Sequence, residues 1–197
     1  MNLAHEHTPG AGAVLVTGGA RSGKSSFAEQ LSSRLAAHGT YLATAQIWDE
    51  EMRQRIALHR TQREQSGFPW ITAEEPMELS AALQACSGER GQGVVLVDCL
   101  TLWLSNRLLK AESSPDAAEQ VDAAVDELVR TVEAYEGPLV LVTNEVGSGI
   151  VPEYPLGRLY RDLAGRMNQR LAQVCGRVFL VTAGIPVELK SRAYRFE

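Results

Sequence analysis

Five short apolar runs constrain the fold of this chain more than any other feature. They are rich in β-branched residues, nearly continuous rather than alternating, and bounded by Gly, Pro or polar residues. They lie at 13–18, 40–45, 93–100, 138–145 and 177–184. Strands buried on both faces have this pattern, because helices cover a parallel sheet on either side. The sequence therefore predicts a core of parallel strands.

Helical patterns separate these runs, at 25–37, 49–65, 76–86, 117–135 and 157–174. This alternation predicts a doubly wound, mostly parallel α/β sheet with helices on both faces. The late segment "IPVELK" predicts an antiparallel C-terminal edge strand. We expect a turn over 86–93, and an exposed loop over 108–120 leading into a helix capped near Ser114 or Asp116.

The size and charge of the chain narrow its class. Its 197 residues most simply form one domain, which we expect over 13–197 after a disordered leader at 1–12. A net charge of -5 disfavours a nucleic-acid partner. No apolar run approaches the roughly 18 residues of a membrane span, and the N-terminus is unlike a secretory signal. Three scattered cysteines predict a cytoplasmic protein without disulfides or a zinc site.

The first apolar run ends in a phosphate-binding pattern, G-x-x-x-x-G-K-[ST], formed by Gly18, Gly19, Ala20, Arg21, Ser22, Gly23, Lys24 and Ser25. Glycines let backbone N–H groups surround a phosphate, and the N-terminus of the following helix adds its positive dipole end. We expect Lys24 to bridge the β- and γ-phosphates and the Ser25 hydroxyl to ligate Mg²⁺. The flanking strand and helix favour a P-loop NTPase-like fold over a glycine-rich turn with a solvated lysine.

Asp98 ends the third apolar run, where strand ends meet ligands in an open α/β sheet. A lone aspartate after a strand is often only a turn or helix cap. Beside a P-loop, we predict that Asp98 contacts Mg²⁺ or the nucleotide. A guanine-binding switch protein is disfavoured, because the chain contains no N-K-x-D sequence and the strand at 138–145 continues as "VTNEVGSG".

Three longer segments carry a family resemblance: "VTGGARSGKSSFAE", "YLATAQIWDEEMRQRIALHR" and "VTNEVGSGIVPEYPLGRLYRDLAGRMNQRLA". In this order, and over about 14–190, they resemble the bifunctional adenosylcobinamide kinase / adenosylcobinamide-phosphate guanylyltransferase family of adenosylcobalamin biosynthesis. The resemblance implies an enzyme that phosphorylates adenosylcobinamide with a nucleoside triphosphate. The same enzyme is expected to transfer GMP from GTP to adenosylcobinamide phosphate through a GMP–histidine intermediate, giving adenosylcobinamide-GDP. The resemblance also implies ATP and GTP as substrates, Mg²⁺ as cofactor, and a homotrimer.

The resemblance maps the nucleophilic histidine onto His59. It also implies nucleotide contacts from Ala43, Thr44, Arg60, Thr61, Gln62, Arg63 and Glu74, with Asp98 at a carboxylate position. The residues alone are less specific. His59 continues the helical spacing of Met52 and Ile56, and a lone histidine on such a stripe is more often a core or boundary residue.

Two questions stay open at this stage. The glycine-containing loop at 144–152 either contacts ligand or covers the sheet edge, and the polar face of the helix at 157–174 is either solvated or part of an interface. Two other functions share the P-loop: a small-molecule kinase without nucleotidyl transfer, and a non-enzymatic nucleotide-gated binding module.

Overall fold

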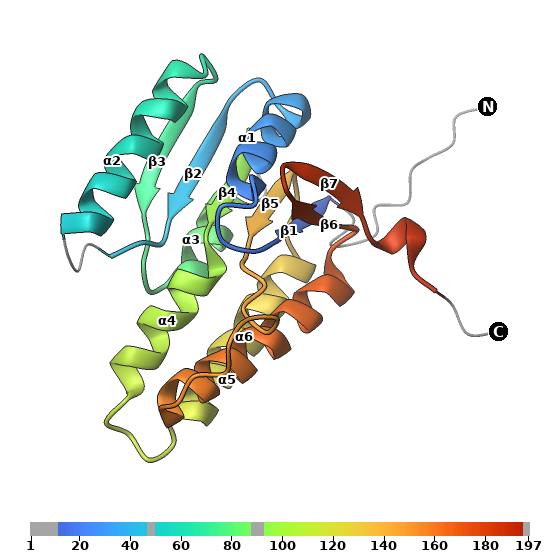
Figure 1. Ribbon diagram of the computed structural model, residues 1–197. Coiled ribbons are helices and arrows are strands. Elements are labelled where there is room, and N and C mark those ends of the chain that lie inside the picture. The colour runs from blue at the N-terminus through green and yellow to red at the C-terminus, as the bar shows by residue number, and fades with distance from the viewer. Residues whose placement is uncertain (1–11, 47–49, 88–92, 195–197) are drawn as a thin grey trace.

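The computed structural model describes residues 12–46, 50–87 and 93–194 (Figure 1). The predicted leader, apart from Gly12, and most of the predicted turn over 86–93 lie outside these ranges. The described chain forms a seven-stranded sheet in the order β3-β2-β4-β5-β1-β6-β7. The strands are β1 (Ala13–Thr17), β2 (Gly39–Ala43), β3 (Trp70–Glu74), β4 (Val94–Asp98), β5 (Leu139–Val142), β6 (Arg177–Thr182) and β7 (Ile185–Glu188).

The helices alternate with the strands along most of the chain. They are α1 (Lys24–Leu35), α2 (Glu50–Gln65), α3 (Leu79–Cys86), α4 (Leu100–Ala111), α5 (Ala117–Glu133) and α6 (Pro155–Val174), with the short 3₁₀ helix η1 (Lys190–Arg192) near the end. Strands β1 to β6 pair in parallel, and β7 runs antiparallel to β6. The predicted doubly wound fold and its antiparallel edge strand are therefore confirmed.

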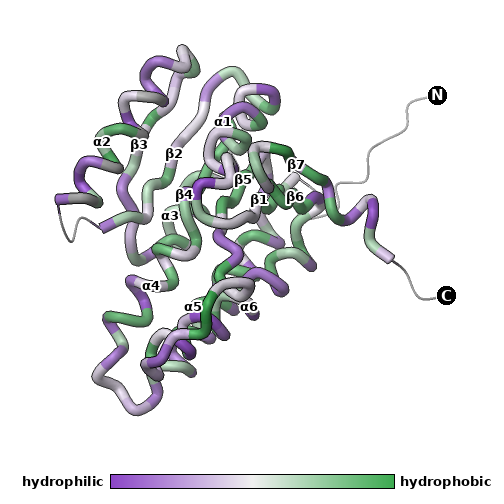
Figure 2. Tube along the Cα trace, viewed as in Figure 1, coloured by the Kyte–Doolittle hydropathy of each residue, from purple (hydrophilic) through white to green (hydrophobic). Residues whose placement is uncertain are grey.

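Each central strand is buried on both faces. In β1, Leu15 packs in the cluster that includes the helices α3 to α6, whereas Val14 and Val16 pack in the cluster that includes α1. Figure 2 shows the hydrophobic colour running along the central strands β4 and β5. Full burial of such aliphatic side chains contributes roughly 1.5–3 kcal/mol each. This two-sided burial explains why the strands read as continuous apolar runs.

One strand and one α-helix were not predicted from the sequence. Strand β3 is an edge strand whose side chains are exposed or half-buried, so it has no apolar run. Helix α4 begins directly after β4, and its buried first turn continues the apolar run of that strand. The loop expected over 108–120 is correspondingly shorter, because α4 extends to Ala111 and α5 begins at Ala117, immediately after Asp116.

Candidate nucleotide-binding site

The P-loop connects β1 to α1 at the carboxyl-terminal edge of the sheet. Gly23 precedes the helix with a φ of 93°, a conformation that side chains other than glycine rarely adopt. A Cβ added at Gly18 would collide with the carbonyl oxygen of Val181. Lys24 is 8% exposed, and its Nζ donates to the carbonyl oxygen of Gly19 at 3.1 Å. The loop therefore curls around its own lysine.

Two buried hydroxyls, one beside this loop and one within it, lack a partner in the described protein. Thr17 ends β1 and Ser22 lies within the loop. Within the described residues, their side-chain oxygens have no hydrogen-bond partner. Buried polar groups in native proteins are nearly always paired. These hydroxyls fit a site that a bound ligand or its water completes.

Next to the P-loop, a cavity of about 190 Å³ opens at the carboxyl-terminal ends of β2, β3 and β4. Residues from α1, α2, α4 and the strand ends line it: Ser25, Tyr41, Ala43, Ala45, Met52, Ile56, Arg63, Glu74, Asp98, Cys99, Leu102 and Asn144. The ends of parallel strands meet at one edge of the sheet, so these distant segments are brought together there.

Asp98 is held by a tyrosine. The hydroxyl of Tyr41 donates to Asp98 Oδ2 at 3.0 Å. Burial raises the pKa of Tyr41 well above its usual value, and the negative charge of Asp98 raises it further. The tyrosine therefore stays protonated and remains a donor to the carboxylate.

Arg63 lies over the same tyrosine. Its guanidinium carbon is 3.7 Å from the centroid of the Tyr41 ring, and the residue is only 6% exposed. A cation over an aromatic face is attracted by the ring quadrupole. Nearby, burial is the main cause that raises the pKa of Glu29 to about 7. The positive charge of Arg63 lowers this pKa, and the negative charge of Asp98 raises it. Buried Arg63 and half-buried Glu29 and Asp98 therefore bring ionisable groups of both signs to this edge.

Thr44 belongs to the framework behind the cavity. Its hydroxyl donates to the Cys99 carbonyl oxygen at 2.7 Å and accepts from the Cys99 backbone N–H at 2.9 Å. The side chain of Asn106 donates to the Thr44 carbonyl oxygen at 2.9 Å. These bonds join the ends of β2 and β4, and so they fix the backbone on which Asp98 is carried.

Helices α4 and α6 anchor the loop at 144–152. The side chain of Asn144 donates to Thr101 Oγ1 at 2.7 Å. The backbone carbonyl oxygen of Asn144 accepts from the side chain of Asn168 at 3.1 Å. Arg158 donates to the carbonyl oxygen of Pro152 at 3.1 Å, and Arg161 donates to that of Gly147. Part of the polar face of α6 is therefore bound to this loop rather than only solvated.

The structure brings five of the predicted site residues to the cavity: Ser25, Ala43, Arg63, Glu74 and Asp98. It places two others on the exposed side of α2. Arg60 pairs with Glu64 at 3.4 Å, and the hydroxyl of Thr61 donates to the Ala57 carbonyl oxygen at 3.1 Å. The P-loop residues Gly19, Ala20 and Arg21 form its exposed tip.

His59 and Gln62 belong to α2 by their backbone, and their side chains are not among those that the structure describes. Met52, Ile56 and Arg63, which share the helical spacing of His59, all line the cavity.

Tyr41 was missed as a site residue from the sequence, and the role of Asn144 was left open there. Tyr41 had a usable signal, since it is the one aromatic residue in the run 40–45. Asn144 lies just after the buried strand β5, and Asp98 is the last residue of β4. Leu102, also in the cavity, was hidden because α4 itself was not predicted.

The donor set fits Mg²⁺. Ser25 supplies a hydroxyl and Asp98 a carboxylate, both line the cavity, and hard oxygen ligands are those that Mg²⁺ prefers. The phosphate oxygens of a nucleotide usually complete such a shell.

A sequence profile of the cobinamide kinase / cobinamide phosphate guanyltransferase family matches residues 14–189. The chain belongs to this family. It is 43% identical over 176 residues to the bifunctional adenosylcobalamin biosynthesis protein CobP of Pseudomonas aeruginosa, covering 89% of this chain and 96% of that protein. It is 42% identical over 185 residues to the bifunctional CobU proteins of Escherichia coli K12 and Salmonella typhimurium, covering 90% of this chain and 99% of each. The predicted family is therefore confirmed.

Solved structures of low sequence identity share the fold. An ATPase from the type III secretion system of pathogenic bacteria superposes with a TM-score of 0.54 and 12% identity, over 87% of this chain and 51% of that one. A protein from Pyrococcus horikoshii OT3 gives a TM-score of 0.51 and 10% identity, over 90% and 85%. Among the described residues, none of the helices combines the length and apolar character needed to cross a membrane.

Proposed function

We propose that this chain phosphorylates adenosylcobinamide with a nucleoside triphosphate and then transfers GMP from GTP to the phosphorylated product. The observation that carries the proposal is the cavity where Ser25, Arg63 and Asp98 meet beside the P-loop, in a chain of the cobinamide kinase family. The two reactions would use this cavity, because both begin with a nucleoside triphosphate.

In the kinase step, the oxygen of the substrate hydroxyl attacks the γ-phosphorus. The bond from that phosphorus to the bridging oxygen breaks, the nucleoside diphosphate leaves, and the hydroxyl proton passes to solvent. Catalysis of this kind is mostly positioning and charge neutralisation. Lys24 and the P-loop N–H groups hold the β- and γ-phosphates, and Arg63 supplies a further buried cation. Mg²⁺ held by Ser25 and Asp98 would add charge neutralisation at the phosphate oxygens.

In the transfer step, a neutral imidazole nitrogen of His59 attacks the α-phosphorus of GTP. The bond to the bridging oxygen breaks and pyrophosphate leaves. An oxygen of adenosylcobinamide phosphate then attacks the same phosphorus, and the P–N bond breaks to return neutral imidazole. Histidine suits this role, since its unperturbed pKa of about 6.5 leaves it largely neutral at pH 7. The position of His59 on the helix whose Ile56 and Arg63 line the cavity supports the assignment.

We further propose Mg²⁺ as the metal, a homotrimer as the assembly, and the cytoplasm as the location. The family resemblance supports the first two. The third is supported by Cys86, Cys99 and Cys175, all of which are free thiols. Light scattering at several protein concentrations tests the trimer.

The decisive experiment uses two labelled forms of GTP. Protein incubated with GTP labelled at the α-phosphate should acquire an acid-labile, base-stable label, as expected for a phosphoramidate, and γ-labelled GTP should leave none. His59→Ala should abolish the label, whereas His38→Ala should retain it, because His38 is an exposed residue between α1 and β2. Mass analysis of the corrinoid product should show adenosylcobinamide-GDP for the wild type and adenosylcobinamide phosphate for His59→Ala.

The alternatives give different products. A kinase without nucleotidyl transfer yields only the phosphate from wild-type protein, and a nucleotide-gated binding module consumes no triphosphate in response to the corrinoid. Undiminished α-labelling of His59→Ala would disprove the assigned nucleophile.

A further inference from the structure

Tyr41 contacts two charged groups, Asp98 and Arg63, to which the proposed function gives different roles at the nucleotide phosphates. Residues 41 and 43 of β2 pair in register with 96 and 98 of β4, so the Tyr41 side chain reaches diagonally along the neighbouring strand to Asp98. The tyrosine is only 4% exposed, yet it lines the cavity. It is thus part of the floor of the site rather than a surface residue.

The hydroxyl of Tyr41 orients the carboxylate. Its bond of 3.0 Å engages Oδ2 of Asp98, a residue that lines the cavity, and does not use the other carboxylate oxygen. A carboxylate without such a partner samples several rotamers, and partners that orient a metal ligand typically contribute about 10- to 100-fold to affinity or activity.

The ring of Tyr41 supports the guanidinium. Arg63 lies 3.7 Å above the ring centroid. On its edge the ring meets Trp70 in a T-shaped contact with centroids 5.8 Å apart, and Trp70 in turn packs on Phe68 at 4.6 Å. The platform under Arg63 is therefore itself held in place by packed aromatic side chains.

We propose that Tyr41 is a positioning residue that sets the spacing between Asp98 and Arg63 across the nucleotide cavity. Its hydroxyl acts on the metal side of the site and its ring acts on the phosphate side. The proposal rests on the roles that the proposed function gives to Asp98 and Arg63.

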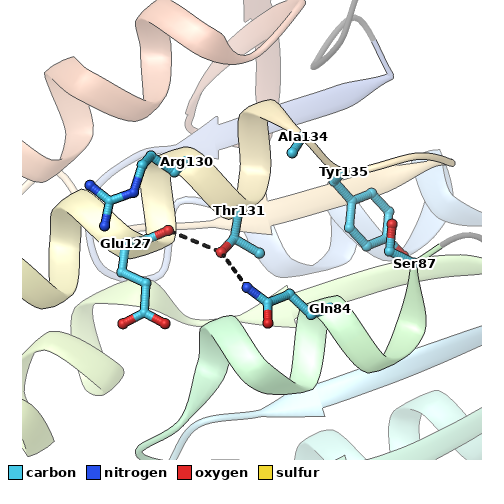
Figure 3. Close-up of a pocket in the computed structure, with 7 residues that line it drawn as sticks. All are labelled: Gln84, Ser87, Glu127, Arg130, Thr131, Ala134 and Tyr135. Atoms are coloured by element: carbon cyan, nitrogen blue, oxygen red, sulfur yellow. Dashed lines mark hydrogen bonds between the residues drawn. The ribbon is translucent and has the colours of Figure 1, made fainter.

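Two substitutions separate the hydroxyl from the ring. Tyr41→Phe removes the bond to Asp98 and keeps the platform for Arg63, whereas Tyr41→Leu removes both. Tyr135→Phe is the matched control, because Tyr135 is also buried and its hydroxyl donates to the Cys86 carbonyl oxygen at 3.3 Å. Tyr135 lines a different cavity, away from the P-loop (Figure 3). Each protein is titrated with Mg²⁺ in the presence of a fluorescent GTP analogue, with binding and kinase turnover measured together.

Tyr41→Phe should raise the Mg²⁺ concentration for half-maximal binding about 10-fold, and saturating Mg²⁺ should restore most of the turnover. Tyr41→Leu should in addition weaken metal-free binding of the analogue by about 3- to 30-fold, the range of a partly desolvated cation–π contact. Tyr135→Phe should change neither quantity. In an Asp98→Asn background, Tyr41→Phe should add little further loss, since the oriented carboxylate is already gone.

An unchanged Mg²⁺ titration for Tyr41→Phe, in a wild type that does bind the analogue with Mg²⁺, overturns the positioning role and leaves the proposed function intact. Equal losses at all Mg²⁺ concentrations, matched by a fall in melting temperature, also overturn it in favour of a packing role. Failure of the wild type to bind the analogue at all would instead remove the proposed function. If Tyr41→Leu does not fold, the Tyr41→Phe titration and the double variant decide the question.

Discussion

Two cavities of nearly equal volume lie at opposite ends of the parallel strands. One, of about 190 Å³, is at the carboxyl-terminal ends of the strands beside the P-loop. The other, of about 200 Å³, lies between the last turns of α3 and α5, which lead into the amino-terminal ends of β4 and β5 (Figure 3). Its lining residues are Gln84, Ser87, Glu127, Arg130, Thr131, Ala134 and Tyr135.

Two polar side chains of the second cavity, Gln84 and Thr131, bind each other. Gln84 donates to the Thr131 hydroxyl at 3.4 Å, and that hydroxyl donates to the Glu127 carbonyl oxygen at 3.0 Å, as the dashed lines of Figure 3 show. At the first cavity, buried Arg63 and half-buried Asp98 are held by Tyr41 from a neighbouring strand and face open space. Volume therefore does not identify a site. The convergence of charged side chains from several strand ends does.

Among substitutions at the two ends of the sheet, Lys24→Ala in the P-loop should cause the largest loss of activity. Without this cation the triphosphate charge is poorly neutralised, so we expect a loss on the order of 10²–10³-fold in both proposed reactions. Steady-state kinetics with adenosylcobinamide and GTP measures the loss, and the melting temperature should change little. Lys110→Ala, an exposed lysine in the last turn of α4, is the control and should behave as wild type. Full activity of Lys24→Ala would contradict the assignment of this loop.

Asp98→Asn should cause the second-largest loss of activity. The amide can still accept from Tyr41 but binds Mg²⁺ weakly, so we expect roughly a 10- to 100-fold loss at limiting Mg²⁺ that excess Mg²⁺ partly restores. The measurement is a Mg²⁺ titration of kinase turnover, with the exposed Asp162→Asn as control. A loss that is the same at every Mg²⁺ concentration, with a lower melting temperature, would indicate a structural aspartate instead.

Thr131→Val tests the second cavity with the opposite expectation. The substitution keeps the shape and removes the hydroxyl that joins α3 to α5. Loss of such a bond destabilises a protein by about 1 kcal/mol. Denaturant unfolding should detect this change, while both catalytic activities stay at wild-type levels. A substantial loss of activity without destabilisation would mean that this cavity takes part in function.

The smallest expected effect concerns Glu29 and pH. Its pKa is raised from 4.5 to about 7, so between these values the folded state keeps a proton that the unfolded state loses. Stability from this group is therefore present at low pH and declines as the pH rises through that window. Glu29→Gln should match wild type near pH 4.5 and become relatively more stable above pH 7, as measured by melting temperature. The exposed Glu112→Gln should show no such trend, and a parallel pH dependence of Glu29→Gln and wild type would contradict the prediction.

Local pattern was enough to predict the fold and the P-loop. Continuous β-branched runs alternating with helical spacing predicted the parallel sheet, because two-sided burial leaves its mark on consecutive residues. The phosphate loop could be predicted because all of its defining residues lie in one short consecutive segment, from Gly18 to Ser25. Strand β3 and helix α4 escaped prediction because one is an exposed edge strand and the other continues an apolar strand run.

Only the tertiary structure distinguished residues that the sequence treats alike. Arg60 and Arg63 were both predicted to contact the nucleotide, yet the rotation of α2 leaves Arg60 exposed beside Glu64 and buries Arg63 over Tyr41. Tyr41 and Asp98 are 57 residues apart, and nothing in either segment indicates their bond. The physical reason is that the partner of a side chain at a strand end depends on which strands pair and in what register, and the crossover connections decide that over long separations.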